Sequence, residues 1–452
     1  MMKSYDISSH HLKMTAVLTD EQTKVLEAVI ARKNIFMTGS PGTGKSYTLK
    51  IIIKHLKQSG IKFAITASTG CSAVLVNGQT IHSYLAMGIG NAKIDRIVGN
   101  LKTKKTKLKQ LQELQCLIID EISMIDDETF TNISKILCKI RENDSPFGGV
   151  QTVLVGDFCQ LLPVRGHYAF TCDLWKEMNL ECIQLTKLIR QQDDEEFQKI
   201  LQQIRFGKCT KTTFQKLLNL KDTSFPSNIV PTKLYSLNSD VEAINQHEIR
   251  KLYKKNTSMS LKDAKIIQCI PSTTDVDLEL DFKISCDIDK DVFRYYAFSN
   301  DKSVKTDDYQ IDLIKGLQIM ITRNINFDTG LINGTIGTII SLNTYSVCIM
   351  DTHQTKHVIY YHKDTNENNN TYVKFMPIKL AYALSIHKSQ GATLDAIEVD
   401  GSTYIFAPGQ LYTALSRAKN LSAIRLLNLD KDSFMCHKAV KEFYQSLDIE
   451  QK

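Results

Sequence analysis

The clearest chemistry in this sequence belongs to a glycine-rich loop near its start. Residues 39–46 read Gly-Ser-Pro-Gly-Thr-Gly-Lys-Ser and match the phosphate-binding pattern G-x-x-x-x-G-K-[ST] completely. The loop lies between an expected strand, residues 34–38, and an expected helix, residues 45–58, as the pattern requires. Its backbone N–H groups and the helix N-terminus would face the phosphates of ATP, Lys45 would reach the β and γ phosphates, and Ser46 would ligate Mg²⁺. We assign phosphate binding to the whole loop: Gly39, Ser40, Pro41, Gly42, Thr43, Gly44, Lys45 and Ser46.

Two adjacent carboxylates and an amide supply the rest of the expected ATP chemistry. Asp120 and Glu121 follow an apolar run at residues 117–119. Asp120 would hold Mg²⁺, and Glu121 would polarise the attacking water, a role that needs a carboxylate within hydrogen-bond reach. Gln160 ends another strand-like segment, where its amide could sense the γ-phosphate. That segment could equally be an ordinary polar loop capped by Asp157, and spacing alone leaves both interpretations open.

The elements around these residues predict an α/β fold. Short runs rich in Val, Ile and Leu alternate with longer helical patterns, which is typical of a parallel sheet covered by helices on both faces. Further strands are expected at residues 62–66, 116–119 and 152–155. A chain of 452 residues exceeds one ordinary hydrophobic core, so we expect more than one domain.

Composition limits the class of protein and its surroundings. Hydrophobic residues make up 42% and charged residues 23%, a balance typical of soluble globular proteins. The net charge of +7 permits an anionic partner without requiring one. The 11 cysteines include no Cys-x-x-Cys pair, which argues against zinc and favours a reducing compartment. No secretory leader or clear mitochondrial transit peptide is expected at the start, and no run approaches the ~20 apolar residues of a membrane helix.

Motifs in a fixed order along nearly the whole chain resemble those of the Pif-type 5′→3′ DNA helicases of superfamily 1. In the first half, the similar segments are residues 66–70 with 78–83 (motif Ia and its extension), 120–124 (motif II), 146–149 (signature segment) and 156–161 (motif III). In the second half, they are residues 185–187 with 190–191 (motif IV), 205–207, 387–391 with 393–394 (motif V) and 412–418 (motif VI). A compact viral member of the family would also fit this pattern.

The resemblance implies two RecA-like P-loop lobes with parallel sheets, ATP between them, and a small inserted SH3-like β-barrel subdomain. The expected boundaries are residues 1–175 for lobe 1, with a small helical segment at about 90–112, residues 176–314 and 374–452 for lobe 2, and residues 315–373 for the insertion. The resemblance carries Gln22 over to adenine and Gly391 to the nucleotide site. It also makes Arg190 and Arg417 arginine fingers, although either would otherwise be an ordinary surface ion pair.

A channel for single-stranded DNA is implied as well. It would need hydroxyls and amides for phosphates and surfaces on which bases stack. The candidates are Thr69, His82, His387, Lys388 and Ser389. The two histidines could instead be structural.

These expectations describe an ATP-dependent DNA helicase that translocates 5′→3′ on single-stranded DNA and unwinds duplex or structured DNA, with ATP and Mg²⁺ as cofactors. Its partners would be single-stranded DNA and duplex junctions, without a membrane, inside the cell at the nucleus or a site of viral DNA replication. Two alternatives stay open. One is an RNA helicase of the same superfamily, with a similar ATP site. The other is a non-motor nucleic-acid-binding P-loop protein, which would typically have lost Lys45, Glu121 or an arginine finger.

Overall fold

The computed structural model divides into two compact units. The first comprises Met1–Lys216, Ile405–Ser416 and Asp430–Lys452, and the second comprises Leu217–Tyr404 and Arg417–Leu429. The structure describes residues 18–88, 93–163, 166–189, 194–226, 230–257, 264–271, 292–301, 304–323, 325–326, 329, 331, 334–366, 371–402 and 404–450. Among these residues, no helix combines the length and the apolar character needed to cross a membrane.

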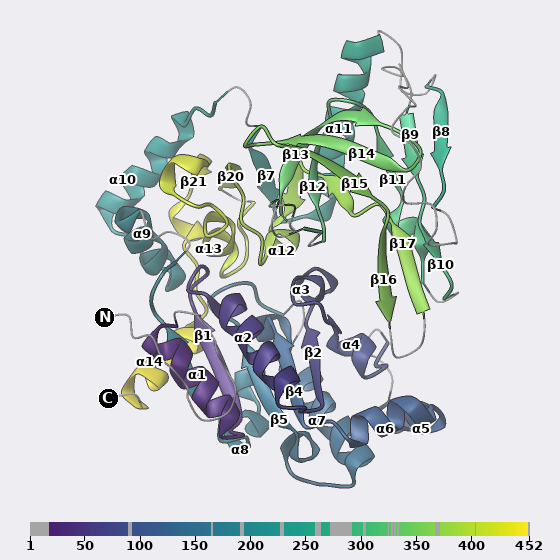
Figure 1. Ribbon diagram of the computed structural model, residues 1–452. Helices are drawn as coiled ribbons and strands as arrows, with labels where there is room; N and C mark the ends of the chain where they lie inside the picture. Colours follow the sequence, from purple (N-terminus) through teal and green to yellow (C-terminus); the bar gives the residue numbers. More distant parts are fainter. Residues whose placement is uncertain are drawn as a thin grey trace. The chain divides into compact units, whose positions relative to one another are not determined.

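The first unit is built on a six-stranded sheet in the order β3-β2-β4-β5-β1-β6, of which Figure 1 labels β1, β2, β4 and β5. The strands are β1 (Ile35–Gly39), β2 (Phe63–Ala67), β3 (Gln79–Thr80), β4 (Cys116–Asp120), β5 (Gln151–Val155) and β6 (Glu181–Leu185). Every neighbouring pair is parallel. Strands β1 and β5 are buried along their whole length, because their apolar runs are covered on both faces.

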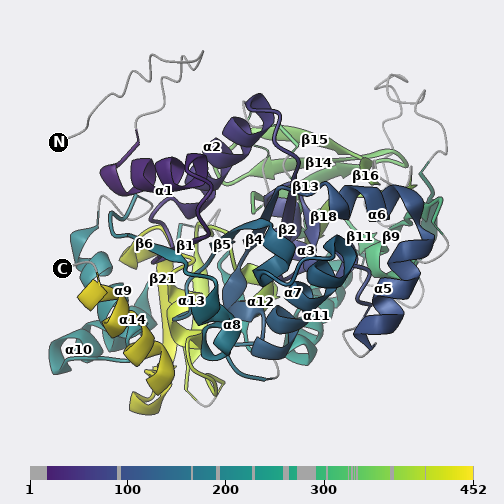
Figure 2. The ribbon, with the colours of Figure 1, turned by 90° about the horizontal axis from the view of Figure 1, so that it is seen from below.

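Alternation along β1 shows how the two faces of this sheet are filled. Ile35 and Met37 pack in the core formed with α1 (Asp20–Ile30) and α2 (Lys45–Gln58). Phe36 points to the other face, because successive side chains of a strand alternate. There its ring lies 5.3 Å from Trp175 and 5.9 Å from Phe443. Figure 2 shows α1 and α2 on one side of the sheet and three helices on the other: α7 (Asp127–Arg141), α8 (Asp173–Glu177) and α14 (Lys438–Glu450).

The remaining helices that begin in the first unit are short. They are α3 (Gly70–Leu75), α4 (Ile81–Tyr84), α5 (Ile94–Thr103), α6 (Lys105–Gln112), α9 (Glu195–Arg205), α10 (Lys211–Asn219) and α13 (Gln410–Leu415). Helices α5 and α6 occupy the stretch for which the sequence predicted a small helical segment.

The second unit contains a four-stranded sheet in the order β19-β7-β20-β21, and all its pairs are parallel. Its strands are β7 (Thr232–Tyr235), β19 (Ala383–Ser385), β20 (Ile397–Gly401) and β21 (Ile424–Leu429). Helices α11 (Asn238–Thr257) and α12 (Ile386–Ser389) lie beside it in sequence and space (Figure 1). Two parallel sheets with covering helices confirm the predicted α/β class.

The other described strands of the second unit pair antiparallel, except for the parallel pair of β8 and β9. Five form one sheet: β12 (Gln318–Ile321), β13 (Ile336–Leu342), β14 (Ser346–Asp351), β15 (Lys356–Tyr360) and β18 (Ile378–Leu380). Two smaller sheets use β8 (Ile266–Cys269), β9 (Val292–Tyr295), β11 (Ile311–Leu313), β10 (Phe298–Ser299), β16 (His362–Asn366) and β17 (Thr371–Phe375). One apolar core joins Ile249 and Tyr253 of α11 to Ile319 and Ile349 of the five-stranded sheet.

The division between the units differs from the one drawn on the sequence. Strand β6, which the predicted boundary after residue 175 placed in the second lobe, pairs with β1 from Ile35↔Glu181 to Gly39↔Leu185. Residues 405–416 and 430–450 also belong to the first unit. No strand was predicted at residues 181–185, and local sequence patterns do not show which sheet a segment joins, which accounts for the difference.

Candidate nucleotide-binding site

The glycine-rich loop leaves the end of β1 and enters α2 at Lys45. Gly39 and Gly44 have φ angles of 147° and 90°, which favour glycine. A Cβ atom on Gly39 would lie 2.4 Å from the carbonyl oxygen of Leu185, and one on Gly44 would lie 2.7 Å from Nε2 of Gln22. Gly44 is the N-cap of this 14-residue helix and offers it no side-chain hydrogen bond. The first-turn N–H groups can therefore serve an anion, as expected for phosphate binding.

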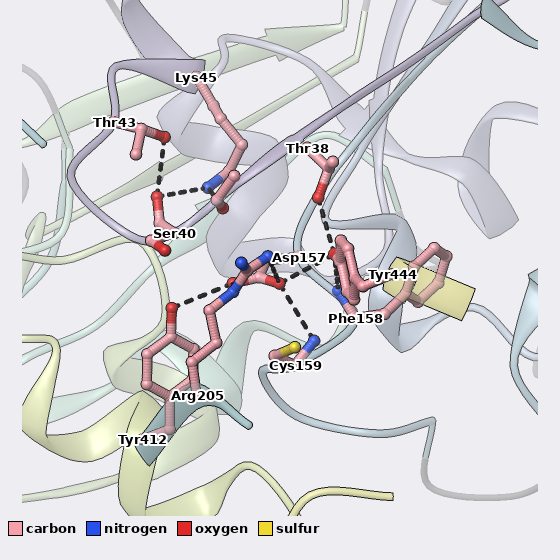
Figure 3. A network of polar contacts seen from close by, with 11 residues as sticks. Thr38, Ser40, Thr43, Lys45, Asp157, Phe158, Cys159, Arg205, Tyr412 and Tyr444 are labelled. Carbon is pink, nitrogen blue, oxygen red and sulfur yellow. Dashed lines mark hydrogen bonds and ion pairs between the residues drawn. The ribbon is translucent and has the colours of Figure 1, made fainter. Parts of the chain in front are cut away.

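Lys45 lies inside the loop that it is expected to serve. Its Nζ donates to the backbone oxygens of Gly39 at 2.6 Å and of Ser40 at 3.1 Å (Figure 3). Burial lowers the pKa of Lys45, and the nearby carboxylates of Asp157 and Glu121 oppose that shift. These carboxylates follow β5 and β4, whose carboxyl ends meet that of β1 at one edge of the parallel sheet. The structure thus brings the loop, the predicted pair Asp120 and Glu121, and Asp157 into one electrostatic site.

Asp120 and Glu121 form a strained acidic pair at the end of β4. Oδ1 of Asp120 accepts a hydrogen bond from the Glu121 N–H at 3.0 Å. Glu121 has φ 53° and ψ 48°, a left-handed conformation that costs a non-glycine residue about 1–3 kcal/mol and that concentrates at functional sites. Burial raises the pKa of Asp120 to about 7, and the neighbouring Glu121 charge adds to the shift. A divalent cation would relieve this repulsion, so the pair fits a metal site.

The donor set suits magnesium held jointly with phosphate. Ser46 is exposed in the first turn of α2. Asp120 is the last residue of β4, whose carboxyl end lies at the same edge of the sheet as the phosphate loop. Within the described part of the chain, no group of three or more His, Cys, Asp and Glu residues could hold a metal ion. Mg²⁺ usually takes only one or two protein oxygens and completes its shell with phosphates and water. The residues present therefore fit Mg²⁺ bound together with ATP.

Two predicted nucleotide contacts are buried amides with an unpaired atom. Gln22 is 1% exposed, and its Nε2 has no hydrogen-bond partner, while its Oε1 accepts from the Thr19 N–H at 3.1 Å. Gln160 is 3% exposed, and its Oε1 also has no partner. A buried polar atom without a hydrogen bond costs free energy, so each amide is suited to accept or donate to a ligand. The contact of Gln22 with Gly44 places the first amide directly beside the phosphate loop.

A buried ion pair beside the loop was missed by the sequence analysis. Nη2 of Arg205 lies 3.0 Å from Oδ1 of Asp157, and the two side chains are 4% and 0% exposed. Tyr412 and Tyr444 donate their hydroxyl protons to the same carboxylate at 3.2 and 3.0 Å (Figure 3). Burial acts to raise the pKa of Asp157, but the charge and hydrogen bonds of Arg205, together with the Lys45 charge and the Cys159 N–H, outweigh it. The pKa is therefore lowered, and the carboxylate stays ionised.

Asp157 also makes the capping contact that the sequence allowed. Its Oδ1 accepts from the Cys159 N–H at 3.1 Å. The sequence signal for the ion pair was an aspartate two residues after a strand, where a buried charge needs a counter-charge. Its partner lies 48 residues away, and local patterns do not identify it.

In the second unit, Arg417 lies against the segment predicted as motif V. It is 1% exposed, and Nη1 donates to the backbone oxygens of Ser389 at 3.5 Å and of Ala392 at 3.4 Å. Gly391 between them is exposed and has a φ of 80°. The other predicted finger, Arg190, lies outside the described residues.

The predicted DNA contacts differ in how accessible their side chains are. Lys388 is exposed and His387 is half-buried, and burial lowers the pKa of His387. Ser389 is fully buried and donates its hydroxyl to the Ile386 oxygen at 2.8 Å, so its side chain is already used within α12.

The two candidates of the first unit lie near short helices. Thr69 is half-buried, and its Oγ1 lies 2.9 Å from Oγ of Ser72. His82 is half-buried within α4.

Comparisons with known proteins identify the family. The chain matches the PIF1-like helicase family over residues 17–215 and the 2B domain of DNA helicase Pif1 over residues 309–342. The ATP-dependent DNA helicase RRM3 of Saccharomyces cerevisiae is 31% identical, over 96% of this chain and 68% of its own length. This chain belongs to the PIF1-like helicase family. The ATP-dependent DNA helicase PIF1 of Xenopus laevis is 30% identical over 96% of this chain and 65% of its own, so the chain spans about two thirds of these PIF1-family relatives.

Solved Pif1 structures agree with this assignment. Pif1 of Bacteroides sp in complex with ADP-AlF4 is 26% identical and has a TM-score of 0.76, covering 96% of this chain and 98% of its own. The Bacteroides helicase in complex with ADP-AlF3 and ssDNA has the same identity and coverage and a TM-score of 0.65. The predicted resemblance is confirmed, and with it the fold class of two parallel-sheet lobes and a small β subdomain.

Proposed function

We propose that this chain is an ATP-dependent DNA helicase that moves 5′→3′ along single-stranded DNA and unwinds duplex or structured DNA. The observation that carries the proposal is the phosphate loop with Lys45 drawn into it and the Asp120–Glu121 pair beside it, in a PIF1-like chain. Relatives bear the name ATP-dependent DNA helicase, and a Pif1 was solved with ADP-AlF3 and ssDNA. Replication, repair and recombination all use such a motor, and the direction follows from the family resemblance.

Each residue of the site has a role in this proposal. The loop backbone holds the triphosphate, and Lys45 exchanges its contacts with Gly39 and Ser40 for phosphate oxygens. Ser46 and Asp120 would hold Mg²⁺, which would neutralise charge on the phosphates. Glu121 orients and deprotonates the attacking water.

The remaining ATP contacts complete the assignment. Gln22 recognises adenine through its unpaired Nε2, and Gln160 senses the γ-phosphate. The family resemblance assigns Gly391 to nucleotide binding and makes Arg190 and Arg417 the arginine fingers, a role worth about 10³–10⁵ in rate.

DNA binding is assigned to Thr69, His82, His387 and Lys388, together with the backbone around Ser389. We further propose two RecA-like lobes, the first extending past residue 175 to include β6, and an SH3-like insertion at residues 315–373.

The test is steady-state ATP hydrolysis with and without single-stranded DNA, for the wild type, Lys45→Ala and Lys54→Ala. Lys54 is an exposed lysine on the same helix and serves as the matched control. We expect strong stimulation by DNA in the wild type and the control, and a loss of at least about 10²-fold in Lys45→Ala. Hydrolysis indifferent to DNA would contradict the helicase proposal and leave only the ATP site.

Single-stranded RNA in the same assay distinguishes a DNA helicase from the alternative of an RNA helicase. Stronger stimulation by RNA than by DNA would favour that alternative. Duplexes with a 5′ or a 3′ single-stranded tail then test direction, and unwinding of the 3′-tailed duplex alone would contradict 5′→3′ movement.

A further inference from the structure

The C-terminal helix α14 packs against the sheet that carries the phosphate loop. The ring of Phe443 stacks on Phe170 with centroids 4.3 Å apart and an interplanar angle of 15°. It also lies 5.6 Å from Phe158 and 6.0 Å from Trp175. This aromatic packing fixes the next residue of the helix, Tyr444, which is fully buried.

The hydroxyl of Tyr444 uses all of its hydrogen-bonding capacity. It donates its proton to Oδ1 of Asp157 at 3.0 Å and accepts from the Phe158 N–H at 3.1 Å. Oγ1 of Thr38 lies 2.7 Å away. A tyrosine hydroxyl has one proton to donate and two lone pairs to accept, so Thr38 must be the donor in this last contact. Burial raises the pKa of Tyr444, which keeps that proton in place.

These contacts join the two strand ends that form the ATP site. Thr38 directly precedes Gly39, the first residue of the phosphate loop, whereas Phe158 lies two residues before Gln160. Strands β1 and β5 are parallel neighbours, and their last backbone link is the Gly156 N–H to the Met37 oxygen at 3.2 Å. The register of the two strands ends at Met37↔Val155, and the Tyr444 hydroxyl contacts a residue beyond that point on each side.

The Asp157–Arg205 pair gives this connection a charged support. The ring of Tyr444 lies 4.6 Å from the Arg205 guanidinium carbon, and its hydroxyl contacts the carboxylate that Arg205 neutralises. Two interactions therefore position Tyr444: its ring packs against the Arg205 guanidinium, and its hydroxyl donates to the Asp157 carboxylate.

We propose that Tyr444 is a positioning residue for ATP hydrolysis, whose hydroxyl holds the phosphate loop and the Gln160 segment in register. The inference rests on the proposed function and adds to it a role for the C-terminal helix, which carries none of the helicase motifs. Alignment matters because a misplacement of ~1 Å can cost a reaction about 10²-fold. Tyr444 acts through Thr38 and Phe158 and touches no substrate itself.

The experiment compares Tyr444→Phe, Thr38→Val, the double variant and the control Tyr168→Phe in the full chain. Tyr168 belongs to the same aromatic cluster, and its buried hydroxyl has no partner, so its removal leaves the strand ends untouched. The kcat and KM for ATP are measured with and without single-stranded DNA. The emission of Trp175, the only tryptophan, reports the folding of the same cluster.

We expect kcat to fall about ten-fold in Tyr444→Phe with an unchanged KM, because γ-phosphate sensing acts after binding. Thr38→Val should also lower kcat, and the double variant should be no slower than the worse single variant, since both remove one shared contact. Tyr168→Phe should match the wild type.

Two results would overturn the inference. One is a Tyr444→Phe protein with a lowered unfolding midpoint but wild-type kcat. The other is an equal loss of kcat in Tyr168→Phe. Hydrolysis without stimulation by DNA would contradict only the helicase proposal. The role of Tyr444 would still be tested, because the variants can be compared in basal ATP turnover. A wild type without any hydrolysis would sink both.

Discussion

Replacing Arg205 by methionine would remove the counter-charge of a carboxylate that has no access to water. Asp157 is 0% exposed, and the guanidinium supplies two of its hydrogen bonds, at 3.2 and 3.0 Å. Methionine fills a similar volume, so the change isolates the charge and its hydrogen bonds. Breaking a buried ion pair from one side costs about 3–5 kcal/mol, because an uncompensated charge stays buried. The hydroxyls of Tyr412 and Tyr444 still contact the carboxylate, so we expect a value near the lower end, about 3 kcal/mol.

Urea unfolding followed by the emission of Trp175 measures this loss in the unit that contains the pair. The double variant Asp157→Asn/Arg205→Met should regain part of the stability, because it leaves no buried charge. Lys199→Met is the matched control: Lys199 is on the same helix, and its ion pair with Glu195 is long, at 3.9 Å, and exposed. It should change little.

Two outcomes would refute the reasoning behind this prediction. A loss below about 1 kcal/mol in Arg205→Met would mean that the pair behaves as a surface ion pair. If the stability losses of Asp157→Asn and Arg205→Met alone simply add in the double variant, the two side chains are not coupled.

Three further predictions concern the nucleotide site and its surroundings. Gln22→Ala should raise the KM for ATP and weaken selection of ATP over GTP, whereas Thr19→Ala, which removes only the helix cap, should cost about 1 kcal/mol of stability and leave KM unchanged; an equal rise in both KM values would assign Gln22 to the cap alone. Gly44→Ala should weaken nucleotide binding in a fluorescence titration, because its Cβ would lie 2.7 Å from Nε2 of Gln22 and would displace that amide, whereas Gly60→Ala, also at positive φ but with open space around it, should bind normally; normal binding by Gly44→Ala would contradict the loop geometry. Burial lowers the pKa of His387 below 6.5, so on acidification this histidine is protonated first in the unfolded chain, and the free energy of unfolding falls as the pH drops below 6.5. The unfolding midpoint of His387→Gln should therefore depend less on pH in this range than that of the wild type, and equal pH dependence in the two proteins would refute the prediction.

Much of the first lobe could be predicted from local patterns. The helix predicted at residues 45–58 has those bounds in the structure, and strands expected at 34–38 and 116–119 appear at Ile35–Gly39 and Cys116–Asp120. Such elements are determined by neighbouring residues: an apolar run, a glycine-rich turn, and an amphipathic helix. The assignment of segments to sheets was harder, because pairing joins segments far apart in the chain: no strand was predicted at residues 181–185, which form β6 and pair with β1.

The candidate site divides along the same line. The phosphate loop and the acidic pair are each formed by adjacent residues, so their residue types and order were enough to predict them. Gln22 and Gln160 were expected as ligand contacts, but only the structure shows that both are buried and that each has one amide atom without a partner.

The sequence by itself determined the chemistry: a P-loop, two carboxylates and an ordered set of helicase motifs, each encoded within a few adjacent residues. Only the tertiary structure decided which distant groups support that chemistry. Tyr444 reaches Thr38 across 406 residues and Phe158 across 286, and Arg205 reaches Asp157 across 48. No local pattern encodes such pairs, because a buried carboxylate or hydroxyl can be satisfied by any donor that the fold brings near.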